Sequence, residues 1–384
     1  MDFSLTDEQR MIRANVERFV EKSYGFERYL ATLAKPSQSD PAVWAQFAEF
    51  GWLSLPMPES AGGLGGSAVD TMLVAEGLGA GLVIEPYVAN VVLSGKLVAL
   101  AGSAAQQETL LGRLVDGTGR LATGFQERGA RYDVRHCATR AEATDAGYRL
   151  NGAKAFLLDA PSAERLIVAA RTAGDTDDED GISLFVVEAQ AAGVSLRPYA
   201  VMGGGVAADL QLDNVEVGTD ALLGEPGQGL AALERALDHA TAAACAEALG
   251  GMQALLRRTT EFARVRKQFG APIGAFQVLQ HRMVDMFNAL EQSRSLVYMV
   301  SMLVDSDDSR ERRKAVSAAK AYLGKASKFV AQQAVQIHGG IGMTEELDVG
   351  HYFRRLTAFG NLYGDRRHHV RRFAELAAAD EMAD

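Results

Sequence analysis

Two segments in the last third of this 384-residue chain combine residue types that can bind a phosphorylated nucleotide. In the first, RVRKQFGAPIGAFQ, Arg266 is followed by Gln268 and later by Gln277. A guanidinium can bind a pyrophosphate through charge-assisted hydrogen bonds, and amide side chains can bind an adenine. In the second, QIHGGIG, Gly339 and Gly340 let a ligand approach the backbone closely. In a plainer interpretation, the basic residues complement the C-terminal dipole of one helix and the glycines end another.

Helices must position both segments, because the chain from about residue 229 to 373 is rich in Ala, Leu, Met, Glu and Arg. Breaks in the helical pattern occur near 270–274, 305–309 and 338–344. The pattern predicts a C-terminal four-helix bundle in which each of the two segments lies at the end of a helix.

The earlier parts of the chain differ from this bundle. Thr6 followed by Gln9 predicts a capped helix, and a second helix should run from Pro41 until Gly51. Short β-rich runs separated by turn residues follow. We therefore expect an α+β multidomain protein with an N-terminal α-helical domain at 1–118, a middle β-barrel or sheet domain at 119–224, and the helical bundle at 225–384.

Composition restricts the class of protein. With 48% hydrophobic and 23% charged residues, the chain is typical of globular proteins, and disorder is excluded as its main state. A formal charge of −10 does not attract nucleic acid. No apolar run reaches the roughly 18 residues of a membrane span, and the start does not resemble a secretory signal, so we expect a cytoplasmic protein. Cys137 and Cys245 lack partners at metal-ligand spacing, so we expect no metal site.

An acidic run, GDTDDEDG at 174–181, lies between two β-rich runs. We interpret it as the solvated tip of a hairpin. Calcium binding is the alternative, although the carboxylates lack the alternating spacing and the closing glutamate of a calcium loop.

Several motifs make the chain resemble the acyl-CoA dehydrogenase family over essentially its whole length. They are FSLTDEQ, LNGAK, RKQFGAPIGAFQ and QIHGGIGMTEE. Within that family, RKQFGAPIGAFQVLQHR and YGDRRHH are most similar to the small subunit of the pimeloyl-CoA dehydrogenase type. The resemblance implies an oxidoreductase that removes an α-proton and a β-hydride from an acyl-CoA thioester. It also implies FAD as the hydride acceptor and an electron-transfer flavoprotein as the next electron acceptor.

The resemblance further implies that FAD lies at a subunit interface. The isoalloxazine would rest in the β domain of one subunit, and the ADP half would contact a neighbouring subunit. By position, Arg266 would contact the pyrophosphate. The other residues that the resemblance places around the dinucleotide are Gln268, Phe269, Gln277, Gln336, Gly339 and Gly340.

The chain departs from the family at the catalytic base, a glutamate in a Tyr-Glu-Gly-Thr segment. Counting without gaps from the Gly-Gly pair places Tyr363 at that position, and the alternative base position of some branches is Ala240. Asp365 is the best substitute, yet it directly precedes a predicted helix. Capping that helix is the simpler role, because helix amides stabilise the ionised carboxylate and make it a weaker base.

A second departure concerns the flavin. The Trp-Ile-Thr segment of the family corresponds to Phe156-Leu157-Leu158, and leucine cannot donate the hydrogen bond that the threonine makes to the flavin. Phe156 could stack near a flavin, although a core aromatic is the commoner role for such a residue.

The chain thus keeps residues that would serve a neighbour's FAD and lacks residues that would serve its own active site. We therefore favour a subunit of a hetero-oligomer, two plus two, whose partner carries the glutamate. Two alternatives stay open: a self-sufficient homo-oligomer with Asp365 as the base, and a catalytically silent scaffold or binding protein with the same fold.

Overall fold

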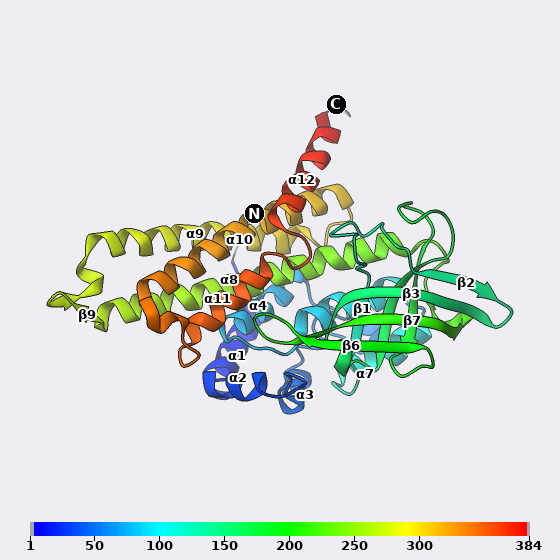
Figure 1. Ribbon diagram of the computed structural model, residues 1–384, viewed down its shortest axis with the longest axis horizontal. Helices are drawn as coiled ribbons and strands as arrows, with labels where there is room; N and C mark the ends of the chain where they lie inside the picture. The colour runs from blue at the N-terminus through cyan, green and yellow to red at the C-terminus, as the bar shows by residue number, and fades with distance from the viewer. Residues whose placement is uncertain (1–3, 382–384) are drawn as a thin grey trace. The chain divides into compact units, whose positions relative to one another are not determined.

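The computed structural model describes residues 4–381, and their contacts divide the chain into two units. The first unit consists of Met1–Ala31, Ala68–Val83 and Thr241–Asp384, and the second of Thr32–Ser67 and Ile84–Ala240. The boundary between them falls within helix α8 (Gly229–Val265). The predicted order of helical, β and helical parts is confirmed (Figure 1). The domain limits at 118/119 and 224/225 stay a prediction.

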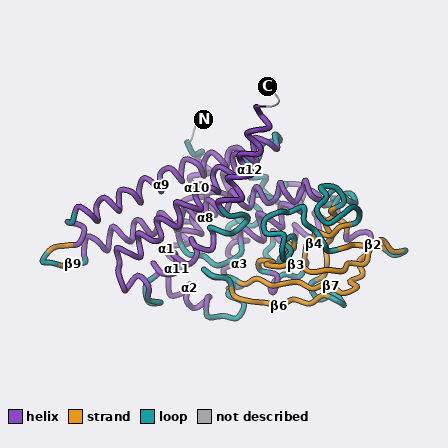
Figure 2. Tube along the Cα trace, turned by 45° about the horizontal axis from the view of Figure 1, so that its top comes forward, coloured by secondary structure: helices purple, strands orange, loops and turns teal. Residues whose placement is uncertain are grey.

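Long helices build the first unit. Besides most of α2 (Phe26–Leu33) and the second part of α8, they are α1 (Asp7–Ser23), α4 (Ala68–Ala80), α9 (Gln277–Leu303), α10 (Ser309–His338), α11 (Asp348–Phe359) and α12 (Arg366–Glu381). Helices α9 and α10 lie side by side (Figure 1 and Figure 2), and α10 also packs against α11 and α12. Val300, Val304 and Val316 are buried between α9 and α10. The predicted C-terminal helical bundle is confirmed.

Local signals in the sequence set two of the helix ends. The Thr6 hydroxyl accepts a hydrogen bond from the Gln9 N–H at 3.2 Å, and the Gln9 side chain accepts one from the Thr6 N–H at 3.1 Å. In the second unit, α3 (Pro41–Glu49) ends just before Gly51, whose φ of 76° lies in the left-handed region. Both predictions are confirmed.

A mixed sheet forms the core of the second unit. Its strands are β1 (Leu121–Gly124), β2 (Arg140–Thr144), β3 (Gly147–Leu158), β4 (Arg165–Arg171), β5 (Ile182–Glu188), β6 (Val194–Ala200), β7 (Val206–Gly218) and β8 (Leu222–Leu223). They follow the order β6-β7-β3-β2-β4-β5-β8, with β1 parallel to β4. Leu166, Val168 and Phe185 are among the side chains buried against the sheet. The predicted β domain is therefore confirmed as a sheet.

Short helices complete the second unit. They are η1 (Glu59–Ala61), the π-helix η2 (Tyr87–Gly95), α5 (Lys96–Ala101), α6 (Ala104–Gln106), the π-helix η3 (Gln107–Leu111), α7 (Gly112–Val115), η4 (Ala160–Ser162) and η5 (Thr219–Ala221). In the part of the chain that the structure describes, no helix is long and apolar enough to cross a bilayer.

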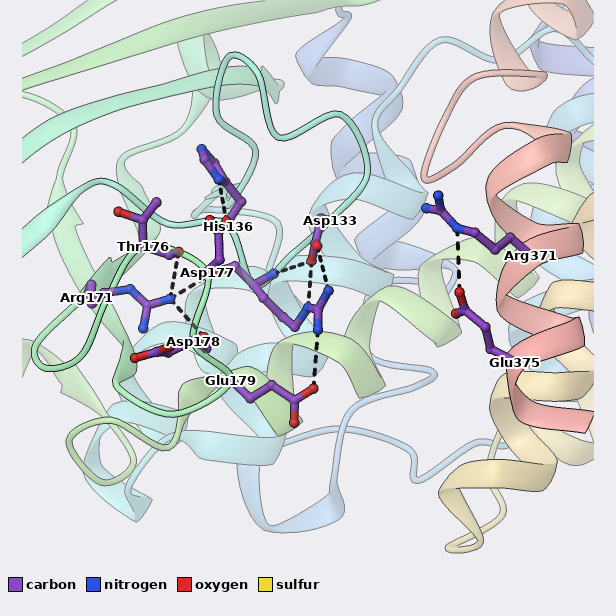
Figure 3. Close-up of polar contacts among 10 residues, drawn as sticks. Asp133, His136, Arg171, Thr176, Asp177, Asp178, Glu179, Arg371 and Glu375 are labelled. Atoms are coloured by element: carbon purple, nitrogen blue, oxygen red, sulfur yellow. Dashed lines mark hydrogen bonds and ion pairs between the residues drawn. The ribbon is translucent and has the colours of Figure 1, made fainter. Parts of the chain in front are cut away.

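The acidic run forms the loop between β4 and β5, as the sequence predicts, and the buried Arg171 holds that loop from inside (Figure 3). Its guanidinium donates hydrogen bonds to the backbone carbonyls of Arg135, Cys137, Thr176, Asp178 and Asp180, at 2.7 to 3.2 Å. A calcium loop would need such inward carbonyl oxygens as ligands. Here a side-chain cation already binds them, which favours the hairpin-tip interpretation.

Candidate functional site

The basic segment forms a short β-hairpin directly after α8. Strand β9 (Lys267–Gln268) pairs antiparallel with β10 (Ala271–Pro272). The backbone N–H of the residue that follows β10 donates a hydrogen bond to the Arg266 carbonyl at 2.8 Å. The turn residues Phe269 and Gly270 have φ of 53° and 81°, as expected for a two-residue hairpin turn. The turn leaves the Phe269 side chain 94% exposed, so this ring is available to a ligand or a partner.

The glycine segment follows the last residue of α10. Gly339 ends this helix with φ of 67°, which residues with a side chain rarely adopt. A Cβ at Gly339 or Gly340 would meet no atom within 4 Å, so this stretch of backbone faces open space. A ligand can therefore approach the turn closely.

A ring contact brings the ends of α8 and α10 together. Phe262, one turn before Arg266, stacks on His338, which directly precedes Gly339, with ring centroids 4.4 Å apart. His338 Nδ1 donates to the Ala334 carbonyl at 2.8 Å, and burial lowers the pKa of His338, which keeps the ring neutral at neutral pH. The two predicted nucleotide segments therefore lie at the same end of the bundle, the end that carries β9 in Figure 1.

The side chains at this end are free to bind a ligand. Arg266 is exposed, and within residues 4–381 its guanidinium has no ion-pair or hydrogen-bond partner. The side chains of Gln268, Gln277 and Gln336 are exposed as well. A guanidinium, several amides and an open glycine turn fit the pyrophosphate and the hydroxyl groups of a dinucleotide. The individual roles of these residues stay predictions.

The second candidate site is the turn between α11 and α12. Tyr363, at the position expected to carry a glutamate, is half-buried and its hydroxyl is shielded from solvent. Asp365 accepts a hydrogen bond from the His368 N–H at 2.8 Å and thereby caps α12. The capping role predicted for Asp365 is confirmed, and its role as a base stays a prediction.

Two buried side chains hold this turn by its backbone. Lys320 of α10 donates hydrogen bonds to the carbonyls of Phe359 at 2.9 Å and Gly364 at 2.8 Å. His369 Nε2 donates to the Tyr363 carbonyl at 3.0 Å. The role of Lys320 is not predictable from local sequence, because the carbonyls that it binds lie 39 and 44 residues further along the chain. The sequence feature that indicates a buried lysine is the position of Lys320 within the apolar stretch AVSAAKAYL.

Lys320 should make the stability depend on pH above neutrality. Burial lowers its pKa from 10.5 to about 8. Between these values the unfolded chain keeps a proton that the folded chain has released, so the free energy of unfolding rises with pH. At 1.36 kcal/mol per pKa unit, this contribution is about 3 kcal/mol. In denaturant titrations, we expect wild type to gain this free energy over Lys320→Met as pH rises from about 8 to 10.5.

Lys328→Met is the matched control, because Lys328 is an exposed lysine on the same helix. Its free energy of unfolding should follow that of wild type at every pH. If the curves of wild type and Lys320→Met stay parallel across the interval, the buried lysine is not the source of the pH dependence.

Asp365 offers a test that separates capping from catalysis. If the carboxylate only caps α12, Asp365→Ala should lower the free energy of unfolding by about 1 kcal/mol, whereas Asp365→Asn and Asp365→Ser should change it little. Neither Asn nor Ser can accept a proton at neutral pH, so a catalytic carboxylate would lose turnover in all three variants. Melting curves beside a dye-reduction assay of the assembled complex measure both effects. Loss of turnover in a stable, FAD-loaded Asn variant would identify Asp365 as the base.

Helix α8 has no carboxylate at the alternative base position, where Ala240 is buried. Two turns further along, Glu247 pairs with Arg355 of α11, with Arg355 Nε 2.7 Å from Glu247 Oε1. Burial and the nearby Glu247 carboxylate raise the pKa of Tyr363. A carboxylate thus lies near the Tyr363 hydroxyl, but it comes from a helix more than 100 residues earlier in the chain, and no motif points to it.

In the second unit, β3 carries the segment expected to support a flavin. Leu157 is buried in the core, while Phe156 and Leu158 are half-buried. Phe156 lies in a β-bulge with φ of 60°, and its N–H donates to Asp209 at 3.3 Å. Asp209 also accepts a hydrogen bond from the Tyr199 hydroxyl at 3.0 Å. The Leu158 side chain has no donor, so it cannot replace a threonine that binds the flavin.

Family models match almost the whole chain in three parts. They are the acyl-CoA dehydrogenase N-terminal domain at residues 6–118, the acyl-CoA dehydrogenase middle domain at residues 122–215, and the acyl-CoA dehydrogenase C-terminal domain at residues 227–377.

Individual relatives match over similar lengths. The probable acyl-CoA dehydrogenase YngJ of Bacillus subtilis (strain 168) is 32% identical, covering 92% of this chain and 93% of the relative. The caffeyl-CoA reductase-Etf complex subunit CarC of Acetobacterium woodii is 29% identical, covering 92% and 94%. A chain of the solved ChsE4-ChsE5 complex from Mycobacterium tuberculosis is similar with a TM-score of 0.89 and 27% identity, covering 98% and 99%.

Proposed function

Because the chain belongs to the acyl-CoA dehydrogenase family, we propose that it is an FAD-dependent subunit of an oxidoreductase that introduces an α,β double bond into an acyl-CoA thioester. The subunit works in a hetero-oligomer of two plus two chains, and its partner supplies the catalytic glutamate. An electron-transfer flavoprotein accepts the electrons. The names of two relatives, one from an Etf complex and one from a complex of two different proteins, support the proposed partners.

One observation carries the proposal: the candidate nucleotide site of this chain has its expected residues, whereas the candidate catalytic site lacks its glutamate. At the β9 end of the bundle, Arg266 is exposed and has no partner among the described residues. At the turn between α11 and α12, Tyr363 replaces the glutamate and the Asp365 carboxylate is bound to a helix N–H. The chain is therefore equipped to bind a neighbour's cofactor but not to remove a proton from its own substrate.

When bound, FAD supplies the hydride acceptor of the reaction. The residues of this chain bind and orient its ADP half. Arg266 holds the pyrophosphate through charge-assisted hydrogen bonds, with Gln268 and Phe269 on either side. Gln277, Gln336 and the open turn at Gly339-Gly340 line the rest of the dinucleotide.

Proton removal falls to the partner's glutamate. Burial and the Glu247 carboxylate raise the pKa of Tyr363 above its usual value, so the phenol keeps its proton at neutral pH and cannot act as a base. In the second unit, Leu158 offers no hydrogen bond to a flavin, which agrees with a weak flavin site in this chain's own β domain.

Purification of the complex from the native host tests the proposal. We expect a second protein of the same fold, with a glutamate at the position of Tyr363, to co-purify with the chain. The purified complex should show a flavin absorbance band. A chain that elutes as an active homo-oligomer would favour Asp365 as the base. A chain that binds no flavin in any assembly would support a silent scaffold and contradict the proposal.

A further inference from the structure

A groove on the surface of the first unit lies between α9, α10 and α12. Helix α10 packs against both of the other helices (Figure 1). The volume of the groove is about 490 Å³. Sites for small organic ligands measure roughly 300–1,000 Å³ and are lined mostly by apolar side chains, with a few polar groups that orient the ligand. The groove is therefore large enough for a small organic molecule.

The floor of the groove is apolar and elongated. Leu296, Met299 and Leu303 share one face of α9, because their spacing of three and four residues is close to the helical repeat. At 1.5 Å of rise per residue, they span roughly 10 Å along the helix. Ala315 and Ala318 of α10 also line the groove, and their short side chains leave space above the floor. This strip can accommodate an extended alkyl chain of medium length.

Helix α12 forms one wall of the groove. The Phe373 side chain lines it, and this residue is 38% exposed. Nearby, the guanidinium of Arg310 in α10 donates hydrogen bonds to the Leu376 carbonyl at 3.0 and 3.3 Å. These bonds hold α12 against α10, so the wall is in place before a ligand arrives. The exposed part of the ring is apolar surface that a ligand can cover.

One lysine lies inside the groove. Lys314 of α10 is half-buried, with its Nζ 5.9 Å from the centroid of the Phe373 ring. That distance is near the outer limit of a cation–π contact. An ammonium group has three donor hydrogens, so Lys314 can bind a carboxylate and keep its contact with the ring.

Two carboxylates also line the groove, but both are engaged at the start of α10. Asp308 accepts hydrogen bonds from two N–H groups of the first turn at 2.9 and 3.1 Å, and Glu311 accepts one from the Ser306 hydroxyl at 3.3 Å. The helix segments around the groove are basic. RERRK at 310–314 and RRHHVRRFAE at 366–375 each contain four arginines or lysines and one glutamate. Although the whole chain carries a charge of −10, this surface therefore attracts anions.

We propose that the groove binds an aliphatic carboxylate of medium chain length. The alkyl chain lies along Leu296, Met299 and Leu303, and the carboxylate pairs with the Lys314 ammonium. Burial of the chain against the apolar floor drives binding, and the ion pair selects an anion over a neutral molecule of the same shape. The groove shares no residue with the candidate nucleotide and catalytic sites, so this inference does not rest on the proposed function.

Isothermal titration calorimetry of the full chain with octanoate tests the proposal. We expect saturable binding of one octanoate per chain. Octan-1-ol has the same chain length without the charge and should bind about tenfold more weakly, in line with the usual worth of a hydrogen bond to a charged group. Butyrate should bind far more weakly than octanoate, because it covers too little of the floor.

Variants of the groove locate the ligand. Lys314→Met removes the charge and should weaken octanoate binding about tenfold, whereas Lys314→Arg should keep most of the affinity. Lys325→Met is the matched control, because Lys325 is an exposed lysine of α10 outside the groove, and its affinity should equal that of wild type. Ala318→Leu narrows the groove and should weaken octanoate and octan-1-ol alike. Melting curves check that each variant is folded.

Three results would each overturn the proposal. They are failure of the wild-type chain to bind octanoate, equal affinities for octanoate and octan-1-ol, and octanoate binding that neither Lys314→Met nor Ala318→Leu weakens. The last result would place the ligand outside the groove. None of these measurements depends on FAD or on acyl-CoA turnover, so each of these results would leave the proposed function intact.

Discussion

Purified by itself, the chain should oxidise acyl-CoA about 10²–10⁴-fold more slowly than its complex with the partner, because a positioned base contributes a factor of this size. The structure gives the reason at both base positions. Tyr363 keeps its proton because burial raises its pKa, and Ala240 has no ionisable group. The nearest carboxylate in sequence, Asp365, is engaged in capping α12.

Dye reduction with butyryl-CoA measures this difference, at equal concentrations of bound FAD. The rate should return when the partner is added, and it should fall again when the partner's glutamate is replaced by glutamine. Turnover of the single chain at a rate near that of the complex would contradict the hetero-oligomer and favour the homo-oligomer.

Arg266→Ala should remove most FAD from the complex. The guanidinium is exposed, has no competing partner among residues 4–381, and lies at the same end of the bundle as the Gly339-Gly340 turn. If Arg266 holds the pyrophosphate as we propose, its loss removes a charge-assisted contact with FAD. The ratio of flavin to protein absorbance after gel filtration reports the occupancy.

Arg264→Ala is the matched control, since Arg264 is exposed in the last turn of α8 and the substitution removes the same charge. It should leave FAD occupancy close to that of wild type. If Arg266→Ala retains FAD as well as Arg264→Ala does, the assignment of the pyrophosphate to Arg266 is wrong. Melting curves of both variants check that the bundle is intact.

Features that depend on neighbouring residues were predictable from the sequence. The Thr6 and Gln9 capping box, the end of α3 before Gly51 and the glycine that ends α10 follow from hydrogen bonds and φ preferences within a few residues. At Phe269 and Gly270 the sequence indicated only a break in the helical pattern, and the structure showed that this break contains a hairpin turn. Helix-favouring composition likewise predicted the bundle, and short β-rich runs between turn residues predicted the β domain.

Contacts between distant segments were not predictable in this way. The sequence does not show which groups Lys320, Glu247 and Arg171 contact. In the structure Lys320 and Arg171 are buried on backbone carbonyls, and Glu247 pairs with Arg355 more than 100 residues away. Every residue has the same backbone carbonyl, so no side-chain pattern predicts which carbonyls accept hydrogen bonds from a buried cationic side chain.

By itself, the sequence determined the order of helical and β parts and the family, and it named the residues that we propose to contact a neighbour's cofactor, because these depend on local propensity and on motif residues. Only the tertiary structure decided that Phe262 and His338 bring two of those motifs together, and that the Tyr363 turn is held by Lys320 and His369. The physical reason is that helix packing sets which side chains and carbonyls meet, and packing depends on the shape of whole helix faces rather than on any short stretch of chain.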